Sequence, residues 1–101
     1  MKKHASDDRE AALVTLLKRF YAGELTEGHL LRALRRDVLG LNQTRYATLV
    51  GISRRTLSDI EGDKSNVTLE VKTRVYRPLG LEVSLLPRKR SLLEQALVPT
   101  E

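Results

Sequence analysis

Cysteine and tryptophan are absent from this chain of 101 residues, and phenylalanine occurs once. Without cysteine there is no disulfide framework and no thiolate zinc site. No apolar run approaches the roughly 20 residues that a membrane-spanning helix needs, and Met1 to Asp8 lead into charged residues rather than into the apolar region of a signal peptide. We therefore expect a cytoplasmic protein with one small core and short appendages.

Acidic residues are outnumbered by basic ones, since 18 Lys and Arg against 13 Asp and Glu give a net charge of +5. This balance favours a polyanionic partner, although charge alone does not choose among nucleic acid, an acidic protein and a membrane surface. His4 and His29 are the histidines, and neither has a second ligand or a paired carboxylate at a suitable spacing. The sequence thus offers no catalytic residue, no metal site and no cofactor site, and we do not expect an enzyme.

The most informative stretch is residues 43–62, which predicts two short helices joined by a tight turn. Its apolar positions at helical spacing are Tyr46, Val50, Ile52, Leu57 and Ile60. Ala47 is small where the helices approach, Gly51 suits the left-handed corner, and Ser53 suits the N-cap of the second helix. This is the pattern of a helix-turn-helix, whose second helix enters the DNA major groove. An ordinary helix pair in a bundle core is the less favoured interpretation.

The chain from about Leu30 to Pro87 resembles the lambda-repressor-like family of helix-turn-helix proteins, of the Cro and Xre type. The matching residues are Leu34-Arg35, Leu41-Asn42-Gln43, Tyr46-Ala47, Val50-Gly51-Ile52-Ser53, Thr56-Leu57-Ser58-Asp59-Ile60-Glu61-Gly62 and Ser65-Asn66-Val67-Thr68-Leu69. The continuation Leu79-Gly80-Leu81-Glu82-Val83-Ser84-Leu85 is similar to the end of HipB-like antitoxins, where a short dimerising strand follows the bundle. The resemblance implies an all-α helical bundle that binds double-stranded DNA, plus one short C-terminal β-strand.

We divide the chain into an extra N-terminal helix (1–25), the helix-turn-helix domain (26–80), the strand (81–87) and a basic hinge with a tail (88–101). The first helix either closes the bundle or contacts a partner. Thr26, Asn42 and Thr68 are expected N-caps, with Gly40 and Gly80 as helix stops. Glu61 is expected to be structural, paired with a basic residue of a neighbouring helix.

The resemblance places DNA contacts on the recognition helix, Arg54 to about Glu61, and around it. Expected base contacts are Arg54, Arg55, Asp59 and Ser58; because Arg recognises guanine and Asp cytosine, we expect G·C pairs in the half-site. Expected phosphate contacts are Gln43, Arg45, Ser53, Thr56, Lys64, Ser65, Asn66 and Arg36. Arg35 is a further candidate for phosphate, and Arg32 is interpreted as part of a solvated face. Asp59 departs from many relatives, so it reads cytosine, pairs with Arg55 one turn earlier, or contributes nothing; pairing is favoured.

Residues 81–85 alternate apolar and polar side chains, which predicts a strand. A lone apolar strand in a helical chain has no internal partner, so we expect it to pair with its own copy across a twofold axis, through Leu81, Val83 and Leu85. An edge segment lying on the bundle is the alternative. Beyond the basic cluster at 88–90, residues 91–98 suit a short amphipathic helix that could dock on a partner.

Together these features predict a homodimeric repressor that binds an inverted-repeat operator and associates with the nucleoid when bound. Many relatives with such a strand are antitoxins that repress their own operon and bind a co-encoded toxin protein. The alternative is a protein–protein adaptor that neutralises a partner toxin or enzyme with little DNA role.

Overall fold

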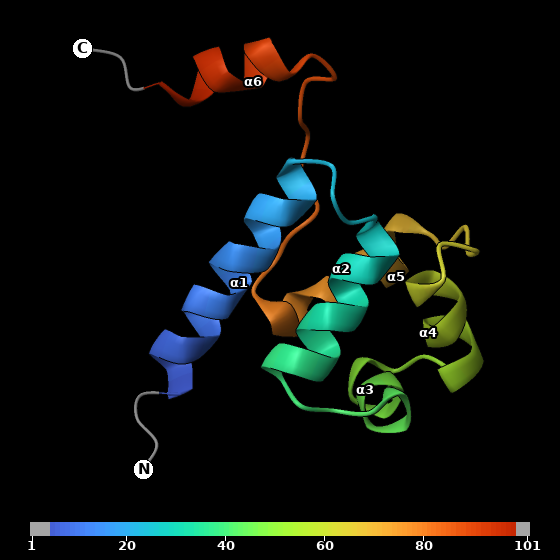
Figure 1. The fold of residues 1–101 in the computed structure, drawn as a ribbon. Helices are drawn as coiled ribbons and strands as arrows, with labels where there is room; N and C mark the ends of the chain where they lie inside the picture. Colours follow the sequence, from blue (N-terminus) through green and yellow to red (C-terminus); the bar gives the residue numbers. More distant parts are fainter. Residues whose placement is uncertain (1–4, 99–101) are drawn as a thin grey trace.

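The structure is a computed structural model, and it describes residues 5–98. Within this range the α-helices are α1 (Ala5–Tyr21), α2 (Glu27–Ala33), α3 (Gln43–Val50), α4 (Arg54–Glu61), α5 (Leu69–Tyr76) and α6 (Arg90–Leu97). A π-helical turn, η1 (Leu34–Val38), continues α2, and a 3₁₀ turn, η2 (Arg77–Leu79), continues α5. Helices α1 to α5 form a bundle, whereas α6 lies outside it, at the end of an extended segment and beside the last residues of α1 (Figure 1).

The bundle helices begin where the sequence predicts, because each predicted cap residue satisfies a backbone N–H group. The side-chain oxygens of Thr26, Asn42, Ser53 and Thr68 accept hydrogen bonds from the third residue beyond each, at 3.1, 2.8, 3.0 and 3.2 Å respectively. Such a cap typically contributes about 1 kcal/mol to helix stability. Local chemistry therefore fixes the starts of α2, α3, α4 and α5.

The core is built from aliphatic side chains and two tyrosines of α2 to α5 and the turns η1 and η2. Its buried members are Leu30, Leu31, Leu34, Tyr46, Ala47, Val50, Leu57, Ile60, Val75, Tyr76 and Leu79. The hydroxyl of Tyr46 donates to the carbonyl of Val75, and that of Tyr76 donates to Glu27, so neither buried phenol is left without a partner. Burial raises the pKa of both tyrosines, which stay neutral. Helix α1 packs its partly buried stripe of Leu13, Leu16, Leu17 and Phe20 against this core.

The second predicted helix differs in form from the prediction, because its last turn is π-helical. The Leu39 N–H donates to the carbonyl of Leu34, five residues earlier, at 3.0 Å. Residues 34–38 contain no proline or glycine that would mark this wider turn in the sequence. The apolar spacing therefore predicted an uninterrupted α-helix through them. The chain then turns at Gly40, where φ is +69°.

The predicted strand is absent from residues 5–98, and for the single subunit that prediction was wrong. The chain leaves the bundle at Gly80 and runs in irregular form to α6 (Figure 1). A strand requires a neighbour with which to form backbone hydrogen bonds, and the remaining described chain is helical or irregular. Leu81 packs partly against the core, whereas Leu85 is 97% exposed. None of the helices described is both long enough and apolar enough to cross a membrane.

Candidate nucleic-acid interface

Helices α3 and α4 meet at a sharp corner that Gly51 forms. Gly51 has φ of 78° and ψ of 37°, a left-handed conformation that strongly favours glycine. Its N–H and that of Ile52 donate to the carbonyl of Ala47, at 2.9 and 3.0 Å, which closes the end of α3. Ala47 is buried between the two helices, as the sequence predicts for a position of close approach. The helix-turn-helix geometry is therefore present.

Helix α4 separates an inward apolar face from an exposed basic start. Leu57 and Ile60 are buried, whereas Arg54, Arg55 and Ser58 are exposed. Arg54 and Arg55 occupy the first turn of the helix, and both side chains are exposed to solvent. The predicted base-contact residues Arg54, Arg55 and Ser58 thus share one accessible surface.

The hydroxyls at the start of α4 are engaged with each other. Ser53 Oγ accepts from the Thr56 N–H at 3.0 Å and donates to Thr56 Oγ1 at 2.8 Å. The Thr56 hydroxyl proton is not used in this pair, so it can still donate to a phosphate. Ser53 therefore has a clear role as the helix cap.

Asp59 pairs with Arg55 one turn earlier, which is the role that the sequence favours. The distance from Arg55 Nε to Asp59 Oδ2 is 3.8 Å, and the Arg55 side chain is 88% exposed. Exposed helical pairs of this kind contribute about 0.3–0.5 kcal/mol. Breaking this ion pair therefore costs little free energy, so Arg55 can turn from Asp59 to contact a DNA base.

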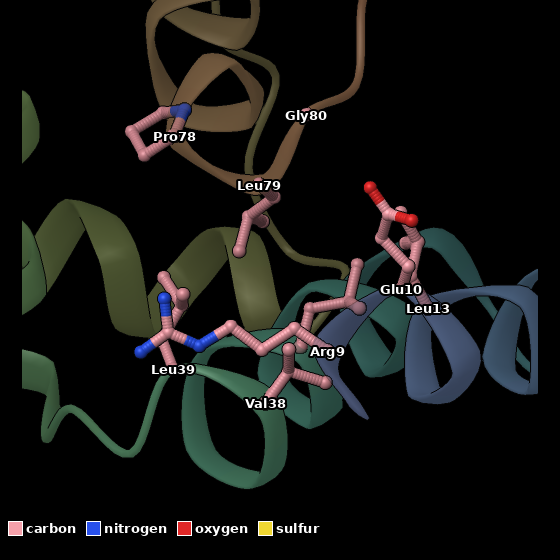
Figure 2. A pocket seen from close by; sticks show the side chains of 9 residues that line it. Arg9, Glu10, Leu13, Val38, Leu39, Pro78, Leu79 and Gly80 are labelled. Carbon is pink, nitrogen blue, oxygen red and sulfur yellow. The ribbon is translucent and has the colours of Figure 1, made fainter. Parts of the chain in front are cut away.

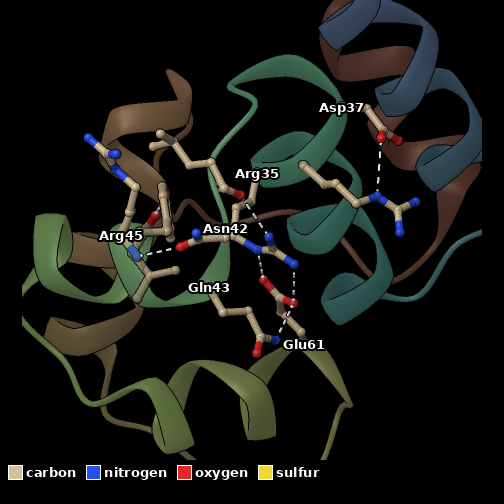
Figure 3. Close-up of polar contacts among 10 residues, drawn as sticks. Arg35, Asp37, Asn42, Gln43, Arg45 and Glu61 are labelled. Carbon is tan, nitrogen blue, oxygen red and sulfur yellow. Dashed lines mark hydrogen bonds and ion pairs between the residues drawn. The ribbon is translucent and has the colours of Figure 1, made fainter.

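A buried polar cluster holds the recognition helix against η1 and α3. Arg35 donates to both carboxylate oxygens of Glu61, from Nε at 2.6 Å and from Nη2 at 3.0 Å, and from Nη1 to the Leu41 carbonyl at 2.8 Å (Figure 3). Gln43 Nε2 donates to the same carboxylate at 3.0 Å. The prediction of a structural Glu61 paired with a basic neighbour is thereby confirmed. Arg35 as a phosphate contact was wrong, because the residue is 5% exposed and all three of its guanidinium nitrogens donate to groups within the fold.

The loop after α4 is anchored by Asp63, for which no role was predicted from the sequence. Asp63 Oδ2 accepts from the Thr26 hydroxyl at 2.6 Å, and Oδ1 accepts from the Gly28 N–H at 2.9 Å. The hydrogen bond from Thr26, with that from Gly28, holds the pKa of Asp63 below its ordinary value. Asp63 has φ of 58°, which aspartate tolerates better than most residues do. The anchor fixes the loop in which Lys64, Ser65 and Asn66 are exposed.

A shallow polar hollow lies where α2, the start of α3 and the end of α4 meet. It is lined by His29, Arg32, Arg35, Gln43, Ser58, Glu61, Gly62 and Lys64. Predicted contacts from three segments, Gln43, Ser58 and Lys64, thus lie around one hollow. Arg32, interpreted from the sequence as solvated, lines it too, because helical rotation brings it onto the same side as His29.

The remaining predicted phosphate contacts lie at different places on the surface. Arg45 is exposed on the first turn of α3, where its backbone N–H donates to the Asn42 cap. Arg36 Nε pairs with Asp37 at 3.2 Å on η1. Asp37 lies on the side of the view away from Asn42 and Gln43 (Figure 3). Arg36 is thus engaged with an acidic neighbour on η1 and does not line the hollow beside the recognition helix.

The corner, the basic start of α4 and the seated helix define a DNA-binding domain of the helix-turn-helix class. Residues 31–83 match the helix-turn-helix family model of the Cro/C1 type. The match covers more than half of the chain, and the chain belongs to this family, as the sequence predicts. The family consists of DNA-binding regulatory domains and is not typically enzymatic. No curated protein and no solved structure matches the chain.

Proposed function

We propose that the protein is a dimeric, sequence-specific transcriptional repressor that binds an inverted-repeat operator. The observation that carries this proposal is the exposed arginine pair, Arg54 and Arg55, at the start of a helix seated by buried contacts. A rigid seat matters because base recognition requires donors held at a fixed height and angle in the major groove. We assign base contact to Arg54, Arg55, Asp59 and Ser58.

Affinity would come mainly from phosphate contacts, which release counterions from the DNA. We assign these contacts to polar and basic side chains that are exposed or half-buried, most of them around α4, and add Arg32 because it lines the same hollow as Gln43 and Lys64. The full set is Gln43, Arg45, Ser53, Thr56, Lys64, Ser65, Asn66 and Arg32, with Arg36 as the outlying member. Each phosphate neutralised contributes about 0.9 to the slope of log affinity against log salt.

Dimerisation would bring two recognition helices to half-sites about 34 Å apart, one turn of DNA. Val83 and Leu85 are exposed in the single subunit, and they alternate with polar residues along 81–85. Antiparallel pairing of this segment with its own copy would complete the backbone hydrogen bonds that the subunit alone does not form. Leu81, Val83 and Leu85 are then the dimer contacts.

We further propose that the protein is an autorepressing antitoxin of a toxin–antitoxin pair. The support is the similarity of residues 79–85 to HipB-like antitoxins, together with the exposed leucines that α6 carries in the single subunit. The same exposed helix favours the second candidate function, a protein–protein adaptor with little DNA role. The autorepressing antitoxin should bind its cognate DNA strongly and in a salt-dependent way, whereas the adaptor should not.

The test is binding to DNA from the upstream region of the protein's own gene, titrated against salt, for the wild type and matched variants. Loss of a bidentate guanine contact costs about 1–3 kcal/mol, so Arg55→Ala should weaken operator binding roughly 5- to 150-fold and change binding to random DNA much less. Arg32→Ala should instead weaken binding to both DNAs and lower the salt slope by about 0.9 per subunit. Arg19→Ala, which removes an exposed arginine on α1 paired with Glu24, is the matched control and should change neither.

Two results would contradict the proposal. If the wild type binds upstream DNA no better than random DNA, this operator is excluded and the adaptor function becomes the better explanation. If Arg55→Ala weakens binding to both DNAs equally, Arg55 contacts phosphate rather than a base.

A further inference from the structure

The C-terminal arm, residues 81–98, leaves most of its large apolar side chains in solvent. Val83, Leu85, Leu86, Leu92, Leu97 and Val98 are all exposed, and α6 buries no residue. Burying such a side chain fully contributes roughly 1.5–3 kcal/mol. Within the subunit, α6 touches the end of α1 through a hydrogen bond from Arg90 to the Tyr21 carbonyl, and that position leaves Leu97 72% exposed. The arm thus has an apolar surface that its own subunit does not cover.

A separate apolar groove lies between α1, η1 and η2, and we refer to it as the α1 groove. Its floor is Leu13, Leu34, Val38, Leu39 and Leu79, with Pro78 and Gly80 at the end where the arm leaves the bundle. Glu10 lies at its α1 edge, and the Arg9 side chain extends from α1 across the groove toward Leu39 (Figure 2). The groove therefore has an aliphatic floor and one charge of each sign beside it.

The apolar pattern of the arm fixes how two copies would pair. Leu81, Val83 and Leu85 are symmetric about Val83, so antiparallel pairing centred there places Leu81 opposite Leu85 of the partner subunit. In the same register, Gly80 lies beside Leu86 of the partner subunit. Because Gly80 ends the α1 groove, the arm of the second copy arrives at the groove immediately after the paired segment.

We propose that the two copies exchange arms, so that α6 of each subunit lies in the α1 groove of the other. This inference rests on the proposed dimer and adds to it an interface made by α1 and α6. The chain from Leu86 to Arg90 spans at most about 14 Å when extended, and α6 of eight residues is about 12 Å long. These lengths are sufficient for the linker to start beside Gly80 of one subunit and for α6 of the other subunit to lie along the α1 groove.

The side chains of α6 suit this position. Leu93 and Leu97 are four residues apart and share a face, as do Arg90 and Glu94 beside them. With the leucines on the groove floor, Arg90 and Glu94 can pair with the opposite charges of Glu10 and Arg9. A stable interface buries roughly 1,200 Å² or more, and two copies of α6 in the grooves would add to the area buried by the paired segments.

Cross-linking tests the exchange, because the chain has no cysteine of its own. Three variants of the full-length chain are treated with a short bismaleimide and separated on a denaturing gel. Val83→Cys reports the twofold pairing, Arg9→Cys/Glu94→Cys reports the exchanged arm, and Tyr21→Cys/Glu94→Cys reports the position of α6 within its own subunit, where both residues line one hollow. The single variants Arg9→Cys and Glu94→Cys are the controls.

We expect covalent dimers from Val83→Cys and from Arg9→Cys/Glu94→Cys, and monomers from both single variants. If Val83→Cys forms dimers but Arg9→Cys/Glu94→Cys does not, the exchange is refuted while the proposed dimer stands. The exchange is also refuted if Tyr21→Cys/Glu94→Cys closes efficiently within one chain. If Val83→Cys stays monomeric and the wild type sediments as a monomer, the proposed dimer fails, and the exchange fails with it.

Discussion

Replacing Glu61 by glutamine tests the cluster that seats the recognition helix. The change keeps the side-chain shape and one acceptor oxygen but removes the negative charge opposite Arg35, whose Nε lies 2.6 Å from Glu61 Oε2. The two side chains are 7% and 3% exposed, so water cannot replace the lost charge. Breaking a buried ion pair by removing one partner costs about 3–5 kcal/mol. Because glutamine still accepts a hydrogen bond, we expect the lower end, about 3 kcal/mol.

A loss of this size is a large part of the free energy of unfolding, which is about 5–15 kcal/mol for a typical domain. It should lower the unfolding temperature by roughly 12–24 °C, since each kcal/mol shifts a domain of this size by about 4–8 °C. The measurement is urea unfolding followed by circular dichroism, at one fixed protein concentration because a dimer's stability depends on concentration.

The matched control is Glu24→Gln, which makes the same chemical change in an exposed pair. Arg19 and Glu24 have side chains 51% and 60% exposed, so their pair contributes about 0–1 kcal/mol. Arg35→Met/Glu61→Met should cost less than the sum of the two single replacements, because no unpaired buried charge remains. A loss below about 1 kcal/mol for Glu61→Gln, or one equal to that of Glu24→Gln, would refute the reasoning.

Two other variants probe the contact between α2 and the end of α4. In Gly28→Ala the new Cβ would lie 2.5 Å from the Glu61 carbonyl oxygen and 2.6 Å from that of Ile60, so we expect urea unfolding to show a loss of about 1–3 kcal/mol; a stabilised variant would contradict the close approach. Asp63→Asn keeps a residue that tolerates φ of 58° but removes a carboxylate whose pKa is lowered in the fold. The carboxylate contributes fully to the free energy of unfolding above its ordinary pKa, and this contribution is lost as the pH falls through the lowered pKa. The variant should therefore be less stable than the wild type at pH 7, and the difference should shrink in acid. If the free energies of unfolding of the wild type and of Asp63→Asn differ by the same amount from neutral to acidic pH, the Asp63 carboxylate does not stabilise the fold in this way.

Features fixed by near neighbours could be predicted from the sequence. The caps Thr26, Asn42, Ser53 and Thr68 each act on an N–H group three residues away, and the corner at Gly51 depends on the conformation of one residue. Apolar spacing within α3 and α4 indicated which side chains face inward. These local rules were enough to predict a helix-turn-helix and to place Arg54 and Arg55 on its exposed start.

The sequence did not reveal which distant segments are in contact. Arg35 and Glu61 are 26 residues apart, and Thr26 and Asp63 are 37 apart, so no spacing rule could reveal which partners meet. It also could not predict which arginine of α2 and η1 turns inward, because Arg32, Arg35 and Arg36 all lie on the polar side of the helical pattern.

Local sequence was sufficient to predict the helix-turn-helix and the exposed arginines that begin its second helix, because periodicity and capping act over a few residues. Three features became visible in the folded chain alone: Arg35 is a buried partner of Glu61, Asp63 anchors the loop, and residues 81–87 form no strand within one subunit. Burial and pairing depend on which segments lie side by side in space. A strand, in particular, exists only where a second segment supplies its hydrogen bonds.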